Sequence, residues 1–154
     1  MKKLLLLILF SILLKGLDAQ NIVGRWQASS AVISDESDEN YQFFTDGTFC
    51  FNLAGDVQLA KVLKIGGTYK IINTNIIFTP TYYIEETGGY LTRTGAEPGT
   101  AQWSFVDTKE NKVQLEKIIK QELPFKLYKS KNNTVLEIDF NKFYKIQSNP
   151  LKYH

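Results

Sequence analysis

Tyr41-Gln-Phe-Phe-Thr-Asp-Gly-Thr-Phe-Cys-Phe-Asn-Leu53 is the stretch that decides the fold. Two aromatic-rich runs flank Asp46-Gly47, a strong short-range signal for a turn between antiparallel strands. A two-residue turn would divide the aromatic side chains between the two faces of the hairpin. A three-residue loop, Thr45-Asp46-Gly47, with a left-handed Gly47 instead gathers four rings on one face. We expect this second register, because burying each ring stabilises the fold by roughly 1.5–3 kcal/mol. It pairs Phe43 with Phe49 and Tyr41 with Phe51, and leaves Gln42, Phe44, Thr48 and Cys50 on the other face.

Turn signals recur at short intervals along the rest of the chain, and the runs between them are rich in Val, Ile, Phe, Tyr and Thr. This spacing predicts an all-β sandwich or barrel. We count eight to ten strands, nearly all sequential neighbours. Such a meander with one apolar face closes most readily into an antiparallel up-and-down β-barrel, because closure removes the unpaired edges.

Two places depart from plain strand patterning before residue 85. Residues 56–65 suit either a short helix stopped by Gly66-Gly67 or a ragged strand. Pro80 cannot donate a hydrogen bond to a sheet ladder. We therefore expect the strand that contains Pro80 to end, to bulge or to lie at an edge at that residue.

The segment Glu85–Thr100 is poor in apolar residues and holds four glycines. We expect a long mobile loop here, with at most a short strand at 90–93. Trp103 and Phe105 then alternate with polar residues in a half-buried strand. A turn at residues 107–111 separates that strand from the next one.

The first 19 residues have the pattern of a signal peptide. Two lysines precede an apolar run of eleven residues, 4–14, whereas a membrane span needs about 20. Residues 20–154 then form a single exported, soluble domain, periplasmic or extracellular. No cysteine lies directly after the apolar run, so we do not expect a lipoprotein. Cys50 is the only cysteine in the chain, so the domain has no internal disulfide and depends on its core.

Charge does not favour a polyanionic partner. Three of the 18 basic residues and one of the 16 acidic residues lie in the expected signal peptide, so the remainder carries equal numbers of each. This balance argues against nucleic acid or an anionic membrane as a partner. No membrane span is expected in the mature chain.

The residue inventory argues against an enzyme. The single histidine, His154, is the last residue, and there is only one cysteine. No His/Cys metal site and no Ser–His or Cys–His pair can therefore form. Glu85-Glu86 could supply carboxylates, but adjacent residues of a strand face opposite ways. We expect no catalytic residue, no metal and no cofactor.

Three short motifs occur in order along the chain: Gly24-Arg25-Trp26, Phe44-Thr-Asp-Gly-Thr-Phe49 and Gly67-Thr-Tyr-Lys70. In this order and spacing the chain resembles the lipocalins, and more closely the small exported bacterial lipocalin-like proteins. The resemblance implies that Gly24 and Trp26 plug the closed end of the barrel. It also implies that a late basic side chain covers the indole by a cation–π contact, which contributes about 0.5–2 kcal/mol. The candidates for that cover are Lys142 and Lys145. Two departures are the missing mid-chain Thr-Asp-x-x-Tyr pattern and the lack of a C-terminal helix.

Two functions compete for such a barrel. In the first, the interior is hollow and binds one small apolar ligand. In the second, bulky inward rings fill the interior, and the protein acts as an envelope or protein-interaction module through its loops, mainly residues 85–100. The residues expected to line the ligand site in the first case are Tyr41, Phe43, Phe49, Phe51, Tyr69, Trp103 and Phe105.

Overall fold

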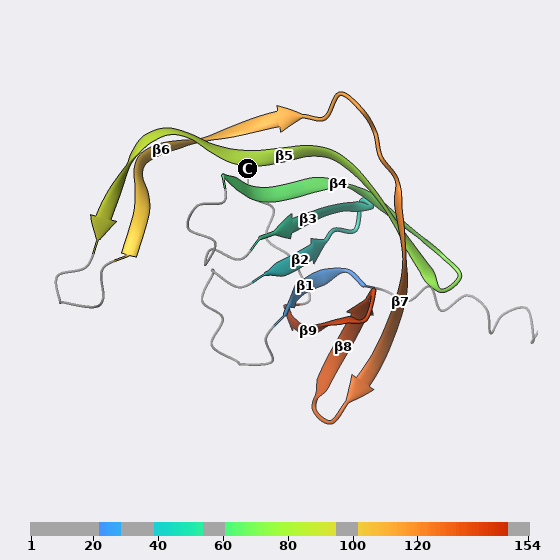
Figure 1. Ribbon diagram of the computed structural model, residues 1–154. Helices are drawn as coiled ribbons and strands as arrows, with labels where there is room; N and C mark the ends of the chain where they lie inside the picture. Colours follow the sequence, from blue (N-terminus) through green and yellow to red (C-terminus); the bar gives the residue numbers. More distant parts are fainter. Residues whose placement is uncertain (1–21, 29–38, 54–60, 95–101, 148–154) are drawn as a thin grey trace, which may run out of the picture.

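The computed structural model describes residues 22–28, 39–53, 61–94 and 102–147. Their regular structure is entirely β-strand, and none of them belongs to a helix long and apolar enough to cross a membrane. Nine antiparallel strands form one sheet (Figure 1). They are β1 (Gly24–Gln27), β2 (Asn40–Phe43), β3 (Thr48–Asn52), β4 (Val62–Ile72), β5 (Asn75–Thr94), β6 (Gln102–Gln114), β7 (Gln121–Ser130), β8 (Asn133–Ile138) and β9 (Asn141–Gln147).

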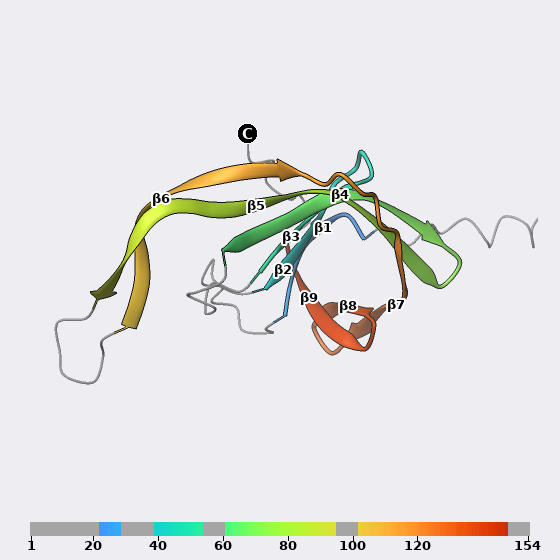
Figure 2. The same cartoon turned by 45° about the horizontal axis from the view of Figure 1, so that its top comes forward.

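The hydrogen bonds of the sheet close a ring. The strand order is β4-β3-β2-β1-β9-β8-β7-β5-β6, and β4 also pairs with β5. Eight strands therefore lie on the ring, while β6 pairs with β5 outside it (Figure 2). This barrel-like arrangement of mostly sequential neighbours confirms the all-β, up-and-down fold predicted from the turn spacing.

The central hairpin has the predicted register. Tyr41 lies opposite Phe51, and Phe43 lies opposite Phe49. The amide of Gly47 donates to the carbonyl of Phe44 at 3.2 Å, and Gly47 has a φ of 80°. Glycine adopts this left-handed conformation without steric cost.

The core sits inside the ring and is built from aromatic rings. Tyr41 stacks on Phe51 with ring centroids 4.3 Å apart, and Phe49 meets Phe78 edge-on at 4.8 Å. Such aromatic pairs prefer offset-stacked or edge-to-face geometry. The buried apolar residues of the core cluster come from both sides of the ring: Ile22, Trp26, Phe43, Phe49, Ile76, Phe78, Phe125, Leu136, Ile138 and Phe143.

The structure shows the outcome for part of the segment 56–65 and for the strand that contains Pro80. Residues 62–65 belong to β4, so a strand and not a helix occupies this part of 56–65. Residues 56–60, like the expected signal peptide, lie outside the described residues. Pro80 lies at a bulge: Gly66 pairs with Tyr82 and Gly67 with Pro80, so Thr81 is the extra residue. The prediction that the proline strand would bulge is confirmed, and the strand continues beyond it.

The prediction of a loop over residues 85–100 is wrong as far as residue 94. β5 continues to Thr94 and pairs with β6 from Tyr82↔Gln114 to Thr94↔Gln102. Gly88 and Gly89, taken as loop signals, have φ values of 72° and 71°. They let the hairpin bend, and cross-strand hydrogen bonds continue on both sides of the bend. Residues 95–100 of the expected loop lie outside the described part of the chain.

The turn predicted at residues 107–111 is also wrong. β6 runs without interruption through this segment. Asp107 has a φ of 58° and stands across the hairpin from the Gly88-Gly89 bend. Aspartate tolerates the left-handed region better than most residues, so the polar run bends with its partner strand and does not reverse direction.

Candidate functional site

Five of the seven residues predicted to line a ligand cavity come together, but they form a packed core. Phe43 meets Tyr69 edge-on with centroids 4.9 Å apart. The Tyr41 ring meets the ring of Phe143 in β9, two strands away in the sheet, with centroids 5.0 Å apart. These aromatic side chains therefore fill the interior of the ring of strands. The five are Tyr41, Phe43, Phe49, Phe51 and Tyr69.

The structure does not bring Trp103 and Phe105 to this cluster. Both lie on the outer part of β6, beyond the last residue pair between β4 and β5, Val62↔Glu85. The Trp103 side chain is 54% exposed. Strand alternation predicts which residues share a face, but not that the hairpin runs past the end of the ring, and that is why this assignment was wrong.

Trp26 is fully buried in β1. Its Nε1 donates a 2.7 Å hydrogen bond to the carbonyl oxygen of Ile22. Lys145 places its Nζ 5.3 Å from the centroid of the Trp26 ring, whereas Lys142 lies opposite Glu137. Of the two lysines considered, Lys145 is thus the one over the indole. Gly24 has a φ of 138°, which favours glycine in the Gly-x-Trp motif.

A groove of about 470 Å³ lies on the opposite face of the sheet from the core. It crosses five consecutive strands, β2 to β6, on the face that carries the even-numbered residues of the central hairpin. We call it the outer groove. Its lining residues are Gln42, Phe44, Asp46, Thr48, Cys50, Lys64, Tyr82, Ile84, Glu110 and Lys112.

One cross-strand row explains the shape of the outer groove. Register places Gln42 opposite Cys50, Cys50 opposite Gly66, and Gly66 opposite Tyr82. Because Gly66 has no side chain, the Tyr82 ring occupies the space that a Cβ at position 66 would need. Glycine inside a strand often marks such a close approach. The groove therefore has an aromatic ring lying along its floor beside the Cys50 thiol.

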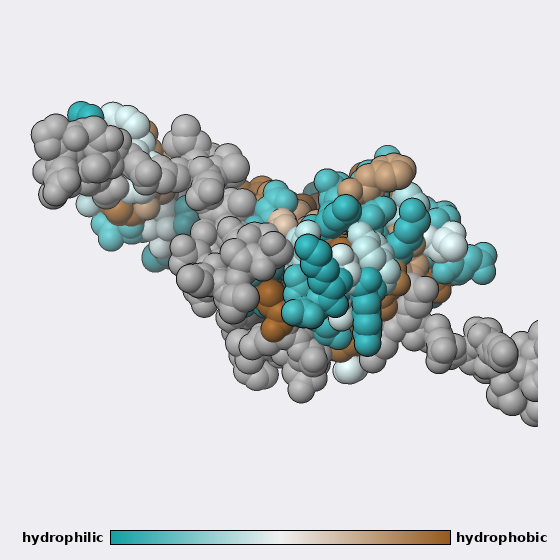
Figure 3. All heavy atoms as spheres, turned by 90° about the horizontal axis from the view of Figure 1, so that it is seen from below, coloured by the Kyte–Doolittle hydropathy of each residue, from teal (hydrophilic) through white to brown (hydrophobic). Residues whose placement is uncertain are grey.

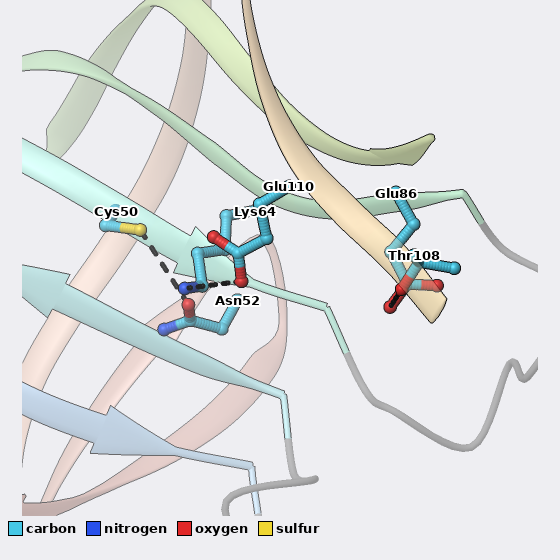
Figure 4. A network of polar contacts seen from close by, with 6 residues as sticks. All are labelled: Cys50, Asn52, Lys64, Glu86, Thr108 and Glu110. Atoms are coloured by element: carbon cyan, nitrogen blue, oxygen red, sulfur yellow. Dashed lines mark hydrogen bonds and ion pairs between the residues drawn. The ribbon is translucent and has the colours of Figure 1, made fainter. Parts of the chain in front are cut away.

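Charged side chains of both signs border the groove. Lys64 lies 4.0 Å from Glu110, and Lys112 places its Nζ 3.9 Å from the centroid of the Tyr82 ring. Figure 4 shows Lys64 and Glu110 beside Cys50 and Asn52, with Glu86 and Thr108 further along the hairpin. With Asp46, the lining carries two lysines and two carboxylates. The border is therefore electrically balanced.

Gln42 is a polar side chain of the groove whose buried oxygen lacks a hydrogen-bond partner among the described residues. Its side chain is only 2% exposed, and its Oε1 has no hydrogen-bond partner in the part of the chain that the structure describes. A buried acceptor without a partner costs about 1–3 kcal/mol. Each such group needs an explanation, and a ligand that donates to Oε1 supplies one.

The titratable groups on the groove floor are suited to contact more than to chemistry. Burial raises the pKa of the Cys50 thiol, and Lys64 lowers it by a smaller amount. Burial also raises the pKa of Tyr82. A thiol with a raised pKa is mostly protonated at neutral pH and is a weak nucleophile. Among the described residues, no group of three or more His, Cys, Asp or Glu side chains could hold a metal ion.

Sequence reasoning missed this groove, although signals for it exist. The hairpin register places Gln42, Phe44, Thr48 and Cys50 together on the face away from the core. Gly66, within a strand pattern, is the second signal. Glu110 could not have been added, because it lay in the expected turn at 107–111, and Lys64 lay in the segment 56–65, which suited a helix as well as a strand. Lys112 follows the expected turn, and its place opposite Ile84 was not predicted.

Comparisons with known proteins find no match to this chain: no family model fits it, and no curated protein or solved structure is significantly similar. The function is therefore inferred from the geometry of the chain itself.

Proposed function

We propose that this protein is a binding protein, not an enzyme, and that the outer groove holds one small organic molecule. The observation that carries the proposal is the buried, unpartnered Oε1 of Gln42 in the groove lining. A volume of about 470 Å³ falls within the range of about 300–1,000 Å³ that is usual for small-molecule sites.

The packed core supports the choice of the outer groove over the interior. A ligand inside the ring of strands would have to displace aromatic side chains such as Phe43 and Phe49, which are at most 4% exposed. Interiors packed in this way have little free volume. A filled interior also fits the solid barrel of the alternative expectation, which was to act through its loops.

The lining indicates the class of ligand. Phe44, Tyr82 and Ile84 offer an apolar surface, and Gln42 Oε1 requires an N–H or O–H donor. The balanced charges give no net attraction for an ion. The proposed ligand is thus an uncharged, largely apolar molecule with one hydrogen-bond donor.

Indole and 1-methylindole form a matched pair of probes, because a methyl group replaces the only N–H donor while the ring system stays the same. We expect saturable binding of indole to the purified protein, with NMR shifts at Gln42, Cys50 and Lys112. We expect 1-methylindole to bind about fivefold to tenfold more weakly, the value of one hydrogen bond. Failure of both probes to shift these signals would overturn the proposal.

Gln42→Met removes the acceptor and keeps a similar volume. In this variant the preference for indole should be lost. The control is Gln121→Met, an exposed glutamine of β7 outside the groove, which should keep the preference for indole. A preference for indole that survives Gln42→Met would contradict the assignment of Gln42.

Export and lipocalin likeness are part of the same proposal. The N-terminal apolar run supports a cleaved leader, and the Gly24-Arg25-Trp26 motif at the start of a barrel-like ring supports the likeness. N-terminal sequencing of the protein recovered from outside the cytoplasm tests the first point: a chain that begins near Gln20 is expected. A chain that retains Met1 would contradict it.

A further inference from the structure

The β5–β6 hairpin extends beyond the ring as a two-stranded arm. Among the described residues, the outermost backbone hydrogen bond from β5 toward the ring is the one that the amide of Glu86 donates to the carbonyl of Lys61, the residue before β4, at 2.7 Å. From there outward, β5 pairs only with β6 among the described residues. Figures 1 and 2 show both strands bending away from the ring. We use "outer arm" for residues 90–94 and 102–106.

Apolar side chains project from both faces of the outer arm. Leu91 lies opposite Phe105 on one face, with Trp103 next to them, while Tyr90 and Val106 form a pair on the other. Tyr90 is 60% exposed and Leu91 46%. Figure 3 shows hydrophobic residues on the arm, at the left of that view. A two-stranded hairpin cannot bury such residues by itself.

The charge of the outer arm is also distinctive. Arg93, opposite Trp103, is the only charged residue in 90–94 and 102–106. A guanidinium pairs well with phosphate oxygens, and a long basic side chain can keep its charge in water while its stem lies on apolar surface. The arm therefore has aromatic rings on both faces, one cation and no carboxylate.

We propose that the outer arm binds a lipid bilayer and lies in its polar–apolar boundary. A protein groove would cover one face of the arm, whereas a lipid interface surrounds both. Tryptophan and tyrosine are enriched at membrane interfaces. Within the described part of the chain, no third strand pairs with the edges of the arm. Edge backbone groups need water, so the arm stays in the headgroup region and does not cross the bilayer. This inference is independent of the outer groove.

The two tryptophans of the chain make the test specific. Trp26 is fully buried, and Trp103 is largely exposed. With phosphatidylcholine vesicles, we expect a blue shift of the tryptophan emission and quenching by brominated phosphatidylcholine. Trp103→Phe should abolish both signals, because Trp26 does not reach the lipid. Absence of vesicle binding by the full protein in a flotation assay would overturn the proposal.

Flotation of variants also tests whether the outer arm, and not another exposed apolar residue, binds the vesicles. The double variant Leu91→Ser with Trp103→Ser should weaken vesicle binding about tenfold to a hundredfold. The control is Phe140→Ser, which removes an 80% exposed ring at the β8–β9 turn and should change nothing. Circular dichroism checks that both variants fold. An equal loss of vesicle binding in both variants would indicate nonspecific adhesion and reject the proposal. A blue shift that depends on protein concentration without vesicles would indicate a second copy of the chain as the partner and would also reject it.

Discussion

The ring of Tyr82 fills the space above Gly66, where any other residue would place its side chain. These two residues lie opposite each other in β5 and β4, one step before the bulge at Pro80. The glycine thus lets an aromatic ring lie flat across a neighbouring strand, toward Cys50. The floor of the outer groove depends on this pair.

Gly66→Ala should move the Tyr82 ring out of its place. The new methyl group would overlap the end of the tyrosine side chain, which can rotate away. We expect a loss of about 1–3 kcal/mol in the free energy of unfolding, as for other overpacked sites. Urea unfolding of both proteins measures it. In a Tyr82→Ala background the same change should cost clearly less, because the two residues are in contact.

The neighbouring glycine offers a contrast to that experiment. A Cβ at Gly67 would meet the backbone of Thr79 and Pro80, which cannot rotate away. Gly67→Ala should therefore destabilise the protein more than Gly66→Ala, and removing the Tyr82 ring should not rescue it. Similar losses at the two positions would show that the ring is not what Gly66 accommodates.

Phe43, at the end of β2, and Phe44, the next residue, point to opposite faces of the sheet. Truncation to alanine should cost much more stability at Phe43 than at Phe44. Phe43 is fully buried among Tyr41, Tyr69 and Phe78, and Phe44 lies in the outer groove. Phe43→Ala should cost about 3–5 kcal/mol. Phe44→Ala should cost roughly 1 kcal/mol, because it buries less area. Chemical denaturation compares them, and equal losses would contradict the hairpin register.

The hairpin register shows why much of the fold could be predicted. Strand side chains alternate with a period of two, so a register shift of one residue would move Tyr41 and Phe43 away from the core. Only a bulged loop at Gly47 keeps all four rings together, and the structure has that loop. Local turn chemistry and face patterning were therefore sufficient for this part.

The arm and the groove could not be predicted in the same way. Gly88 and Gly89 look like a loop signal in the sequence, but the structure uses their positive φ values to bend a paired hairpin. Whether a glycine breaks or bends a strand depends on the partner strand, which a local pattern does not identify. The groove needs Lys112 beside Tyr82, a long-range contact that follows from pairing and not from composition.

Lys145 should stabilise the protein through Trp26, while Lys142 should not. Lys145→Met keeps the alkyl stem and removes the charge 5.3 Å from the indole centroid. We expect a loss of about 0.5–2 kcal/mol. Lys142→Met, at an exposed position of β9, should stay within about 0.5 kcal/mol of the parent. Thermal unfolding measures both. A Trp103→Phe background leaves Trp26 as the only tryptophan, so its emission should shift only in the Lys145 variant.

Cys50 should react slowly with alkylating reagents until the pH is high. Burial raises the pKa of its thiol above the ordinary value of 9.0, and only the thiolate is nucleophilic. Because this pKa is higher in the folded than in the unfolded state, the thiol stabilises the fold fully below the unfolded value, and that contribution is lost as the pH rises through the folded one.

Mass spectrometry of iodoacetamide-treated protein, sampled across pH, gives the midpoint for Cys50. Lys64→Met should move this midpoint still higher, because the Lys64 charge partly opposes the effect of burial. Lys129→Met, an exposed lysine of β7 outside the groove, should leave it unchanged. Cys50 is the only cysteine, so the label reports one site. A midpoint below the ordinary value, or no response to Lys64→Met, would mean that the thiol is not buried beside Lys64 in the groove.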